Sequence, residues 1–241
     1  MRAHDAQKNE LKPWLRQQWV IPPQANAEFA CAMEEVLEVY TRSHDPSRPV
    51  VCLDELSKQW GAETRTSIPA KPGQPERVDY EYERCGTANL FMRNEPLLGQ
   101  RQVIVTERRT AVDFAQVVRD LLERRYPRAE QVVLVMDNLN THKPAALYEA
   151  FEPALARALL ERLEIHHTPK HGSGLNTAEI ELSVLSRQCL DRRIPDIDIL
   201  TQEVAAWEQA RNASPRPVNW RFTTPDARIK LKRLYPSIQS G

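Results

Sequence analysis

Two uninterrupted apolar runs, each followed at once by an aspartate, constrain the fold of this chain most. The first run is Val50–Leu53, followed by Asp54, and the second is Val132–Met136, followed by Asp137. Runs of this length that are rich in β-branched residues are typical of strands buried on both faces of a sheet. In open α/β sheets, functional sites form at the carboxyl ends of central strands. If the two strands are neighbours, their aspartates lie close together.

The remaining pattern supplies the other elements of such a sheet. Three more strands are predicted at 88–92, 102–106 and 164–168, with a Gly99-containing hairpin between the first two. Helices are predicted at 26–40, 111–125, 144–162, 176–190 and 197–210. Asn26, Thr110 and Pro144 stand where these helices begin. This order of elements predicts an α/β fold, with a mixed sheet flanked by helices on both faces.

Close carboxylates suggest a cation. Two of them repel unless one keeps a proton or a positive ion lies between them, and hard oxygen ligands suit Mg²⁺ or Mn²⁺. The helix predicted at 176–190 offers a third carboxylate, because Glu179 and Glu181 flank its apolar face on opposite sides. Periodicity does not choose between them. The plainer alternative is that each aspartate only begins a loop or caps a helix.

Composition excludes several classes of protein. The chain has 241 residues, 41% of them hydrophobic, and its 33 basic and 33 acidic side chains cancel, which is ordinary for a globular domain. It has no apolar run long enough to cross a membrane, and the polar start Met1–Lys8 predicts no signal peptide. The four cysteines lie far apart without a CxxC pair, so we expect neither a zinc site nor a disulfide scaffold. We therefore expect a cytoplasmic protein without a membrane partner.

Three ordered motifs carry a resemblance to a known family. They are Val51–Glu55, Val135–His142 and Thr168–Glu179, and further similarity appears at Asp79–Tyr82, Gly86–Phe91 and Phe222–Arg228. With these motifs the chain resembles the DDE transposases, in particular the bacterial insertion-sequence group related to the mariner elements. The resemblance covers roughly residues 35–236. Two positions depart from the usual pattern, since Gly174 replaces a tryptophan and His167 a tyrosine.

The resemblance implies a fold, a site and a reaction. It implies an RNase H-like, mixed five-stranded sheet in which the first and fourth strands are neighbours. It assigns the catalytic and metal-binding acids to Asp54, Asp137 and, through the pattern Leu-Asn-x-x-Glu, Glu179. Two Mg²⁺ or Mn²⁺ ions held there would support DNA strand cleavage and strand transfer at the ends of an insertion sequence. Double-stranded DNA is the expected partner, with a homodimer in the DNA complex and a location at the nucleoid.

Several further residues are candidates for contacts around that site. Asn138 and His142 follow Asp137 closely, and they either support that carboxylate from outside, contact DNA, or only stabilise their own loop. The stretch Arg211–Tyr235 is strongly basic, and its bland interpretation is a solvated face. Its candidates for contacts to backbone phosphates are Arg221, Arg228, Lys230, Lys232 and Arg233.

The sequence divides into a helical extension (1–49), a catalytic domain (50–210) and a basic tail (211–241). Transposases of this group carry helix-turn-helix domains before the catalytic core, so we expect a core whose sequence-reading domain is missing or lies on a separate polypeptide. The alternative is a non-catalytic DNA-binding or dimerising fragment that regulates a full-length enzyme. A phosphatase of the haloacid dehalogenase type is disfavoured, because Leu56 stands where that chemistry needs a second aspartate.

Overall fold

A single mixed sheet forms the centre of the molecule. The structure is a computed structural model, and it describes residues 25–75, 77, 79 and 81–236. The strands are β1 (Val50–Glu63), β2 (Tyr82–Glu95), β3 (Gln100–Thr106), β4 (Val132–Met136) and β5 (Leu163–His167). They lie in the order β3–β2–β1–β4–β5, with β1 antiparallel to β2 and parallel to β4. The predicted five-stranded, RNase H-like arrangement is therefore confirmed, including the pairing of the first and fourth strands.

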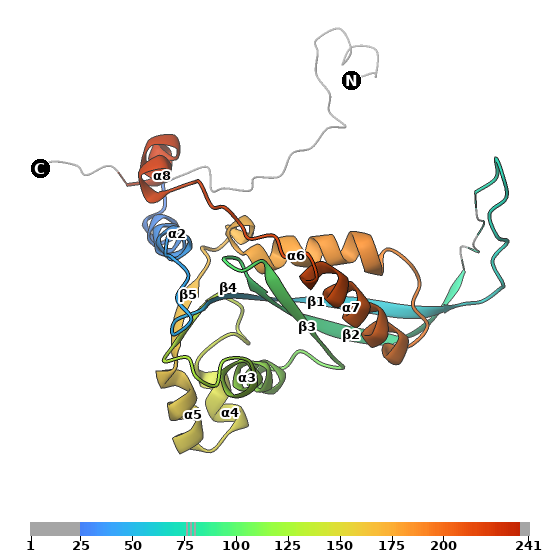
Figure 1. Cartoon of the computed structure of the whole chain (residues 1–241), viewed down its shortest axis with the longest axis horizontal. Coiled ribbons are helices and arrows are strands. Elements are labelled where there is room, and N and C mark those ends of the chain that lie inside the picture. Colours follow the sequence, from blue (N-terminus) through green and yellow to red (C-terminus); the bar gives the residue numbers. More distant parts are fainter. Residues whose placement is uncertain (1–24, 76, 78, 80, 237–241) are drawn as a thin grey trace, which may run out of the picture.

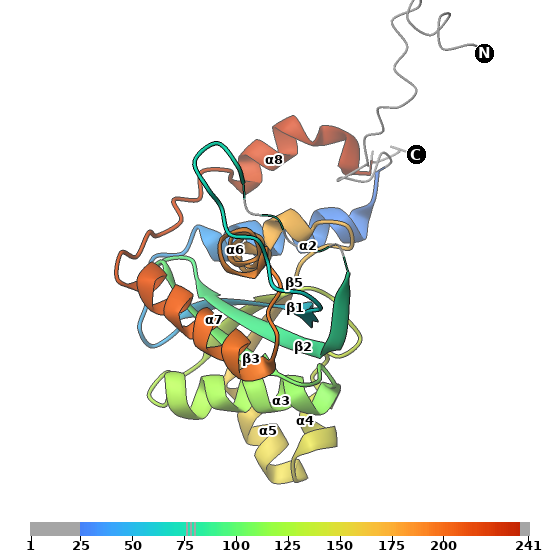
Figure 2. The ribbon, with the colours of Figure 1, turned by 90° about the vertical axis from the view of Figure 1, so that its right-hand side faces the viewer.

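Helices cover both faces of this sheet, as Figures 1 and 2 show. One face carries α3 (Ala111–Asp120), the π-helical turn η1 (Leu121–Arg125), α4 (Ala145–Ala150) and α5 (Pro153–Glu161). The other carries α2 (Ala27–Tyr40), α6 (Thr177–Leu185), the π-helical turn η3 (Ser186–Leu190) and α7 (Ile197–Asn212). The remaining short elements are η2 (Ser173–Leu175), α8 (Thr224–Lys230) and η4 (Lys232–Leu234).

Alternation along the two central strands decides which way their aspartates point. In β1, Val51 and Leu53 join the hydrophobic core under α3, whereas Val50 and Cys52 join the core under α6. In β4, the even-numbered residues face α3 and the odd-numbered residues Val133 and Val135 face α6. Because side chains alternate with period two, Asp54 and Asp137 continue the rows that face α6.

The prediction that the first strand ends at Asp54 is wrong. Pairing of β1 with β4 does end there, since Leu53 and Met136 are the last partners. Pairing with β2 continues to the partners Glu63 and Tyr82, so β1 and β2 run on as a two-stranded arm that projects beyond the helices (Figure 1). The polar residues after Asp54 mask this arm in the sequence, because only one neighbouring strand supports it.

The prediction of one helix at 144–162 is also wrong, because this stretch forms two helices. The first, α4, ends at Ala150, and Phe151 is extended before α5 begins at Pro153. A proline inside a helix removes a backbone donor and clashes with the preceding turn, whereas at the first helical position it fits. The predicted helix starts at Asn26 and Thr110 are confirmed, since both side chains cap their helices.

The last described elements, α8 and η4, pack against the first described helix. Phe29, Met33 and Leu37 of α2 form a small separate core with Ala227 and Leu234. The backbone N–H of Asn26 donates to the carbonyl of Leu234 at 2.9 Å. The division of the chain at residues 49 and 210 stays a prediction, and residues 1–24 of the predicted extension lie outside the described ones. None of the helices in the described part has the length and apolar character that a bilayer crossing requires.

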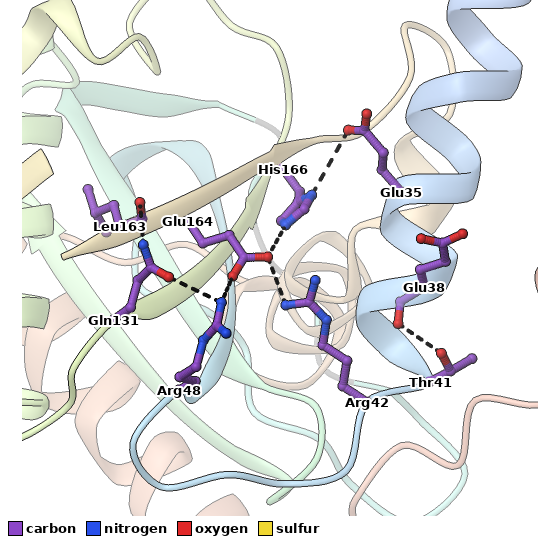
Figure 3. Close-up of polar contacts among 9 residues, drawn as sticks. All are labelled: Glu35, Glu38, Thr41, Arg42, Arg48, Gln131, Leu163, Glu164 and His166. Carbon is purple, nitrogen blue, oxygen red and sulfur yellow. Dashed lines mark hydrogen bonds and ion pairs between the residues drawn. The ribbon is translucent and has the colours of Figure 1, made fainter. Parts of the chain in front are cut away.

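An ion-pair network closes the β5 edge of the sheet (Figure 3). The carboxylate of Glu164 on β5 forms ion pairs with Arg42 Nη1 and His166 Nε2, each at 2.8 Å, and also with Arg48. Burial would raise the pKa of Glu164, but the hydrogen bonds from His166 and Arg42 outweigh it and lower the pKa from 4.5 to about 2. The folded protein therefore binds this proton less tightly than the unfolded chain does.

Replacing Glu164 by glutamine is expected to lower the free energy of unfolding by about 2 kcal/mol at pH 7, with allowance for the partly exposed arginines. Because the pKa is depressed, this stabilisation is complete above pH 4.5, the ordinary pKa of the group, and is lost as the pH falls toward about 2. Urea titrations between pH 7 and pH 3 should show the difference between wild type and variant shrinking. The exposed ion-pair residue Glu161 is the control, and Glu161→Gln should cost less than about 0.5 kcal/mol. A difference independent of pH would contradict this assignment.

Candidate active site

Three acids that are distant in the sequence line one cavity at the centre of the sheet. Asp54 comes from β1, Asp137 directly follows β4, and Glu179 lies in the first turn of α6. All three line a cavity of about 410 Å³, together with Arg109, Leu139 and Asn176. The parallel pairing of β1 with β4 and the covering helix therefore bring together the acids that were singled out from the sequence.

The electrostatics of Asp54 reflect this crowding. Burial is the largest cause that raises the pKa of Asp54 from 3.8 to about 7, and the negative charges of Asp137, Glu55 and Glu179 raise it further. The backbone N–H of Glu55, which donates to Asp54 Oδ1 at 2.9 Å, acts in the opposite direction. A cation in the cavity would favour the ionised form of this carboxyl group.

Asn176 fixes the start of α6 against β1. Its Oδ1 caps the helix by accepting from the N–H of Ala178 at 3.1 Å, and its Nδ2 donates to the carbonyl of Leu53 at 3.0 Å. The preceding residue is held as well, because the Tyr40 hydroxyl donates to the carbonyl of Leu175 at 2.6 Å. These bonds place the first turn of α6, and with it Glu179, beside Asp54.

Glu181 points elsewhere, although periodicity alone left it equal to Glu179. Its carboxylate lies 3.1 Å from Nε of the buried Arg101 and 3.3 Å from Nη2 of Arg211. Those two arginines neutralise it on the flank of α6 next to β3 and α7. The structure thus places Glu179, and not Glu181, beside the two aspartates.

The donor set of the cavity fits a hard divalent cation. Carboxylate oxygens are the ligands that Mg²⁺ and Mn²⁺ prefer. Glu179 Oε2 is buried without a hydrogen-bond partner, which is costly for a carboxylate unless an ion occupies the space beside it. Within the described residues, no three His, Cys, Asp or Glu side chains are already close enough to hold a metal. The three acids therefore share a cavity but would have to draw together around an ion.

His142 joins Asp137 to a second, deeply buried carboxylate. Its Nδ1 donates to Asp137 Oδ1 at 2.6 Å, and its Nε2 lies 2.8 Å from Glu55 Oε2 in a close ionic contact without hydrogen-bond alignment. The ring packs on Phe114 of α3, with 4.8 Å between centroids. Burial alone would lower the pKa of His142, but the contacts with Asp137 and Glu55 raise it to about 9. The ring is therefore a cation between two carboxylates at neutral pH.

Asn138, the other predicted neighbour of Asp137, does not line the cavity of the three acids. Asn138 is exposed and lines a second hollow of about 380 Å³, together with Asp137, Lys170 and His171. His167, at the end of β5, donates from Nδ1 to the carbonyl of Asp137 at 3.1 Å. Gly174, where the resembling group has tryptophan, has no neighbour within 4 Å of the position a Cβ would take. The chain therefore leaves open space at that position.

A larger hollow of about 600 Å³ lies between β3 and α3, away from the three acids. Its charges pair with one another, for example Arg119 with Glu123 and Arg124 with Asp120. Size alone therefore does not mark the functional cavity.

Sequence reasoning missed two residues of the site, Glu55 and Arg109. Glu55 is 2% exposed in its side chain and lies between His142 and Arg109, whose Nη1 is 3.8 Å from Glu55 Oε1. Glu55 follows Asp54 directly, and that adjacency was the available signal. Arg109 carried none, because it is one of many arginines between residues 101 and 128.

The basic candidates near the C-terminus differ in their surroundings. Arg221, Lys230, Lys232 and Arg233 are exposed. Arg228 instead makes two hydrogen bonds to Glu34 of α2, at 2.8 and 2.7 Å, and Glu34 also accepts from the Tyr235 hydroxyl. Arg228 therefore anchors α8 to α2. Lys230 Nζ lies 5.5 Å from the centroid of the Phe222 ring, and the other three are exposed to solvent.

Comparisons with known proteins agree with this arrangement. A search of the curated proteins returned no match. Among solved structures, the Mos1 mariner paired-end complex with Mn matches with a TM-score of 0.54 and 18% identity, over 85% of this chain and 65% of that chain. The paired-end complex with Mg gives a TM-score of 0.55 and 17% identity, over 96% and 74%. The Mos1 strand transfer complex gives 0.53 and 16%, over 86% and 62%.

These likenesses show a shared fold, and the chain spans slightly less than two thirds of the Mos1 chain in two of the three. The family itself is shown by a family model. The model described as DDE superfamily endonuclease matches residues 49–201, well over half of the chain and all three acids of the cavity. The chain therefore belongs to the DDE superfamily endonucleases.

Proposed function

We propose that this chain is the catalytic core of a transposase, which cuts DNA at insertion-sequence ends and joins the ends to target DNA. The observation that carries the proposal is the convergence of Asp54, Asp137 and Glu179 on one cavity from three separate elements. Membership of the DDE superfamily endonucleases supports it, as does the likeness to Mos1 paired-end and strand transfer complexes.

Asp54, Asp137 and Glu179 would together hold two Mg²⁺ or Mn²⁺ ions. Such ions favour deprotonation of an attacking water or DNA 3′-hydroxyl, and they stabilise the leaving oxygen of an in-line attack on a phosphodiester. His142 holds Oδ1 of Asp137 through a hydrogen bond, which orients that carboxylate from outside the cavity. Asn176 keeps Glu179 next to Asp54 by tying α6 to the backbone of β1. In this proposal the described side chains only bind the ions and hold the ligands in position, and no covalent intermediate with the enzyme forms.

The partner in this proposal is double-stranded DNA, at transposon ends and at the target, in a complex of two copies of this chain. Arg221, Lys230, Lys232 and Arg233 would neutralise backbone phosphates, an interaction independent of sequence and weakened by salt. Asn138 would face the DNA from the second hollow. Sequence recognition would come from a helix-turn-helix unit. Such a protein would work at the nucleoid in the cytoplasm.

Metal removal tests the proposal directly. The full chain is incubated with a supercoiled plasmid that carries the DNA flanking its own gene, in Mg²⁺, in Mn²⁺ and in excess EDTA. Nicked and linear products are expected with either metal and none with EDTA. The Glu179→Gln variant should lose the products, and Asp198→Asn, which changes an exposed carboxylate outside the cavity, should keep them. DNA binding without metal-dependent cleavage would instead support the regulatory fragment.

A further inference from the structure

Arg109 gives the acidic cavity a side that attracts anions. Among the described residues that line this cavity, Arg109 is the one cation, whereas Asp54, Glu55, Asp137 and Glu179 are acids. It belongs to the connection between β3 and α3, whereas Glu179 lies on α6 at the other face of the sheet. Arg109 and Glu179 therefore reach this cavity from elements that lie on opposite faces of the sheet.

The guanidinium of Arg109 is largely free. Its nearest ionic partner is Glu55 Oε1 at 3.8 Å, which is longer than a charged hydrogen bond, and its side chain is 52% exposed. It makes no hydrogen bond to any residue in the described part of the chain. Glu55, in turn, is already in contact with His142 at 2.8 Å. Arg109 is thus oriented by Glu55 while its donors remain available for another acceptor.

The backbone that carries Arg109 is fixed on both sides. Before it, the Thr106 hydroxyl donates to the carbonyl of Arg108 at 2.6 Å. After it, Thr110 caps α3, and its N–H and hydroxyl both donate to Asp113 Oδ2, at 2.7 and 2.6 Å. A side chain on such a support loses less freedom when it binds than one on a loose loop does.

We propose that Arg109 binds a backbone phosphate of the DNA strand being cleaved, next to the scissile bond, and so sets the position of that strand over the three acids. An arginine fork presents paired N–H donors that match two phosphate oxygens, which a lysine does not reproduce. This inference rests on the proposed function, because it assigns a substrate contact within that site. Arg109 would offset the repulsion between the acids and the incoming phosphate.

The test compares Arg109→Ala and Arg109→Lys with Arg108→Ala, which removes a neighbouring exposed arginine that does not line the cavity. Nicking of an end-containing duplex by Arg109→Ala should fall about 30-fold in kcat/KM, with only partial recovery in Arg109→Lys. Arg108→Ala should change it less than about threefold. Thermal stability and Mn²⁺ binding should be unchanged in all three, which separates a DNA contact from structural support of Glu55.

Neutral phosphates locate the contact. A series of duplexes carries one methylphosphonate at each position around the scissile bond. At one position, the methylphosphonate should lower the activity of the wild type to the level that Arg109→Ala shows on the unmodified duplex. At that position it should not lower the activity of Arg109→Ala further. Equal losses in both proteins at every position would overturn the proposal, as would wild-type nicking by Arg109→Ala.

Binding separates this proposal from the proposed function. Affinity for the uncleaved duplex is measured by fluorescence anisotropy, with Ca²⁺ in place of Mg²⁺. A weaker affinity in Arg109→Ala than in Arg108→Ala supports the contact even if the wild type fails to nick DNA, a result that would count against the proposed function alone. Equal affinities of the two variants would overturn the contact.

Discussion

Replacing Asp137 by asparagine is expected to abolish metal-dependent nicking, with a loss of about 10³-fold or more. The side chain supplies one of the three carboxylates of the cavity, and charge stabilisation by a catalytic metal is worth several kcal/mol in the transition state. Asparagine keeps an oxygen that accepts the hydrogen bond from His142, so the loop after β4 should keep its shape. The measurement is the initial rate of plasmid nicking in Mg²⁺.

Folding and chemistry are separable in this variant. Removal of one negative charge relieves repulsion with Asp54 but also takes from His142 one of its two carboxylate partners, so the melting temperature of Asp137→Asn should change by only a few degrees, while Mn²⁺ binding measured by calorimetry should weaken. Asp198→Asn, on the exposed surface of α7, should nick at the wild-type rate. Background cleavage of the same size in wild type and Asp137→Asn would defeat the catalytic assignment.

The second large effect is expected at His142, where phenylalanine should lower the free energy of unfolding by about 3–5 kcal/mol. The new ring retains the stacking on Phe114, but it leaves the buried Glu55 carboxylate with only the longer, 3.8 Å contact to Arg109. Nicking should also fall about 10–100-fold, because Asp137 loses the hydrogen bond that orients it. Chemical denaturation and nicking rates together measure both changes.

A double-mutant cycle identifies the cause of the instability. In the His142→Phe background, Glu55→Gln removes that buried charge and should restore more than half of the lost stability. In the wild-type background the same Glu55→Gln change should be destabilising, because it removes a charge that His142 faces. If the two losses simply add, the contact between His142 and Glu55 is not what stabilises this region.

The two aspartates at the centre of the site could be predicted from the sequence, because the patterns that identify them lie within short stretches of chain. The uninterrupted apolar runs Val50–Leu53 and Val132–Met136 are enough to predict two buried strands, and parallel pairing then brings Asp54 and Asp137 together. Glu179 required the family resemblance. The physical reason that excludes Glu181 lies in Arg101 and Arg211, two residues that only the folded chain brings to it.

Three features could not be predicted correctly from the sequence. Two of them depend on contacts between distant segments, and the third depends on one residue, Pro153, whose effect was misjudged. Glu55 resembles any polar strand residue until His142 is placed beside it. The long extension of β1 depends on β2 alone, which no pattern within residues 55–63 reveals. Pro153 was visible, but an apolar stretch on both sides hid its effect on the helix. Local periodicity therefore located the elements better than their ends or partners.

The packing of α8 and η4 against α2 brings the two ends of the described chain close together. Asn26 bonds to Leu234, and Glu34 binds both Arg228 and Tyr235, so the first described helix lies beside the last described elements. Any segment appended at either end would leave the folded body from the same spot. A short linker across that spot, with new ends opened elsewhere, would yield a circular permutant whose carboxylates keep their geometry.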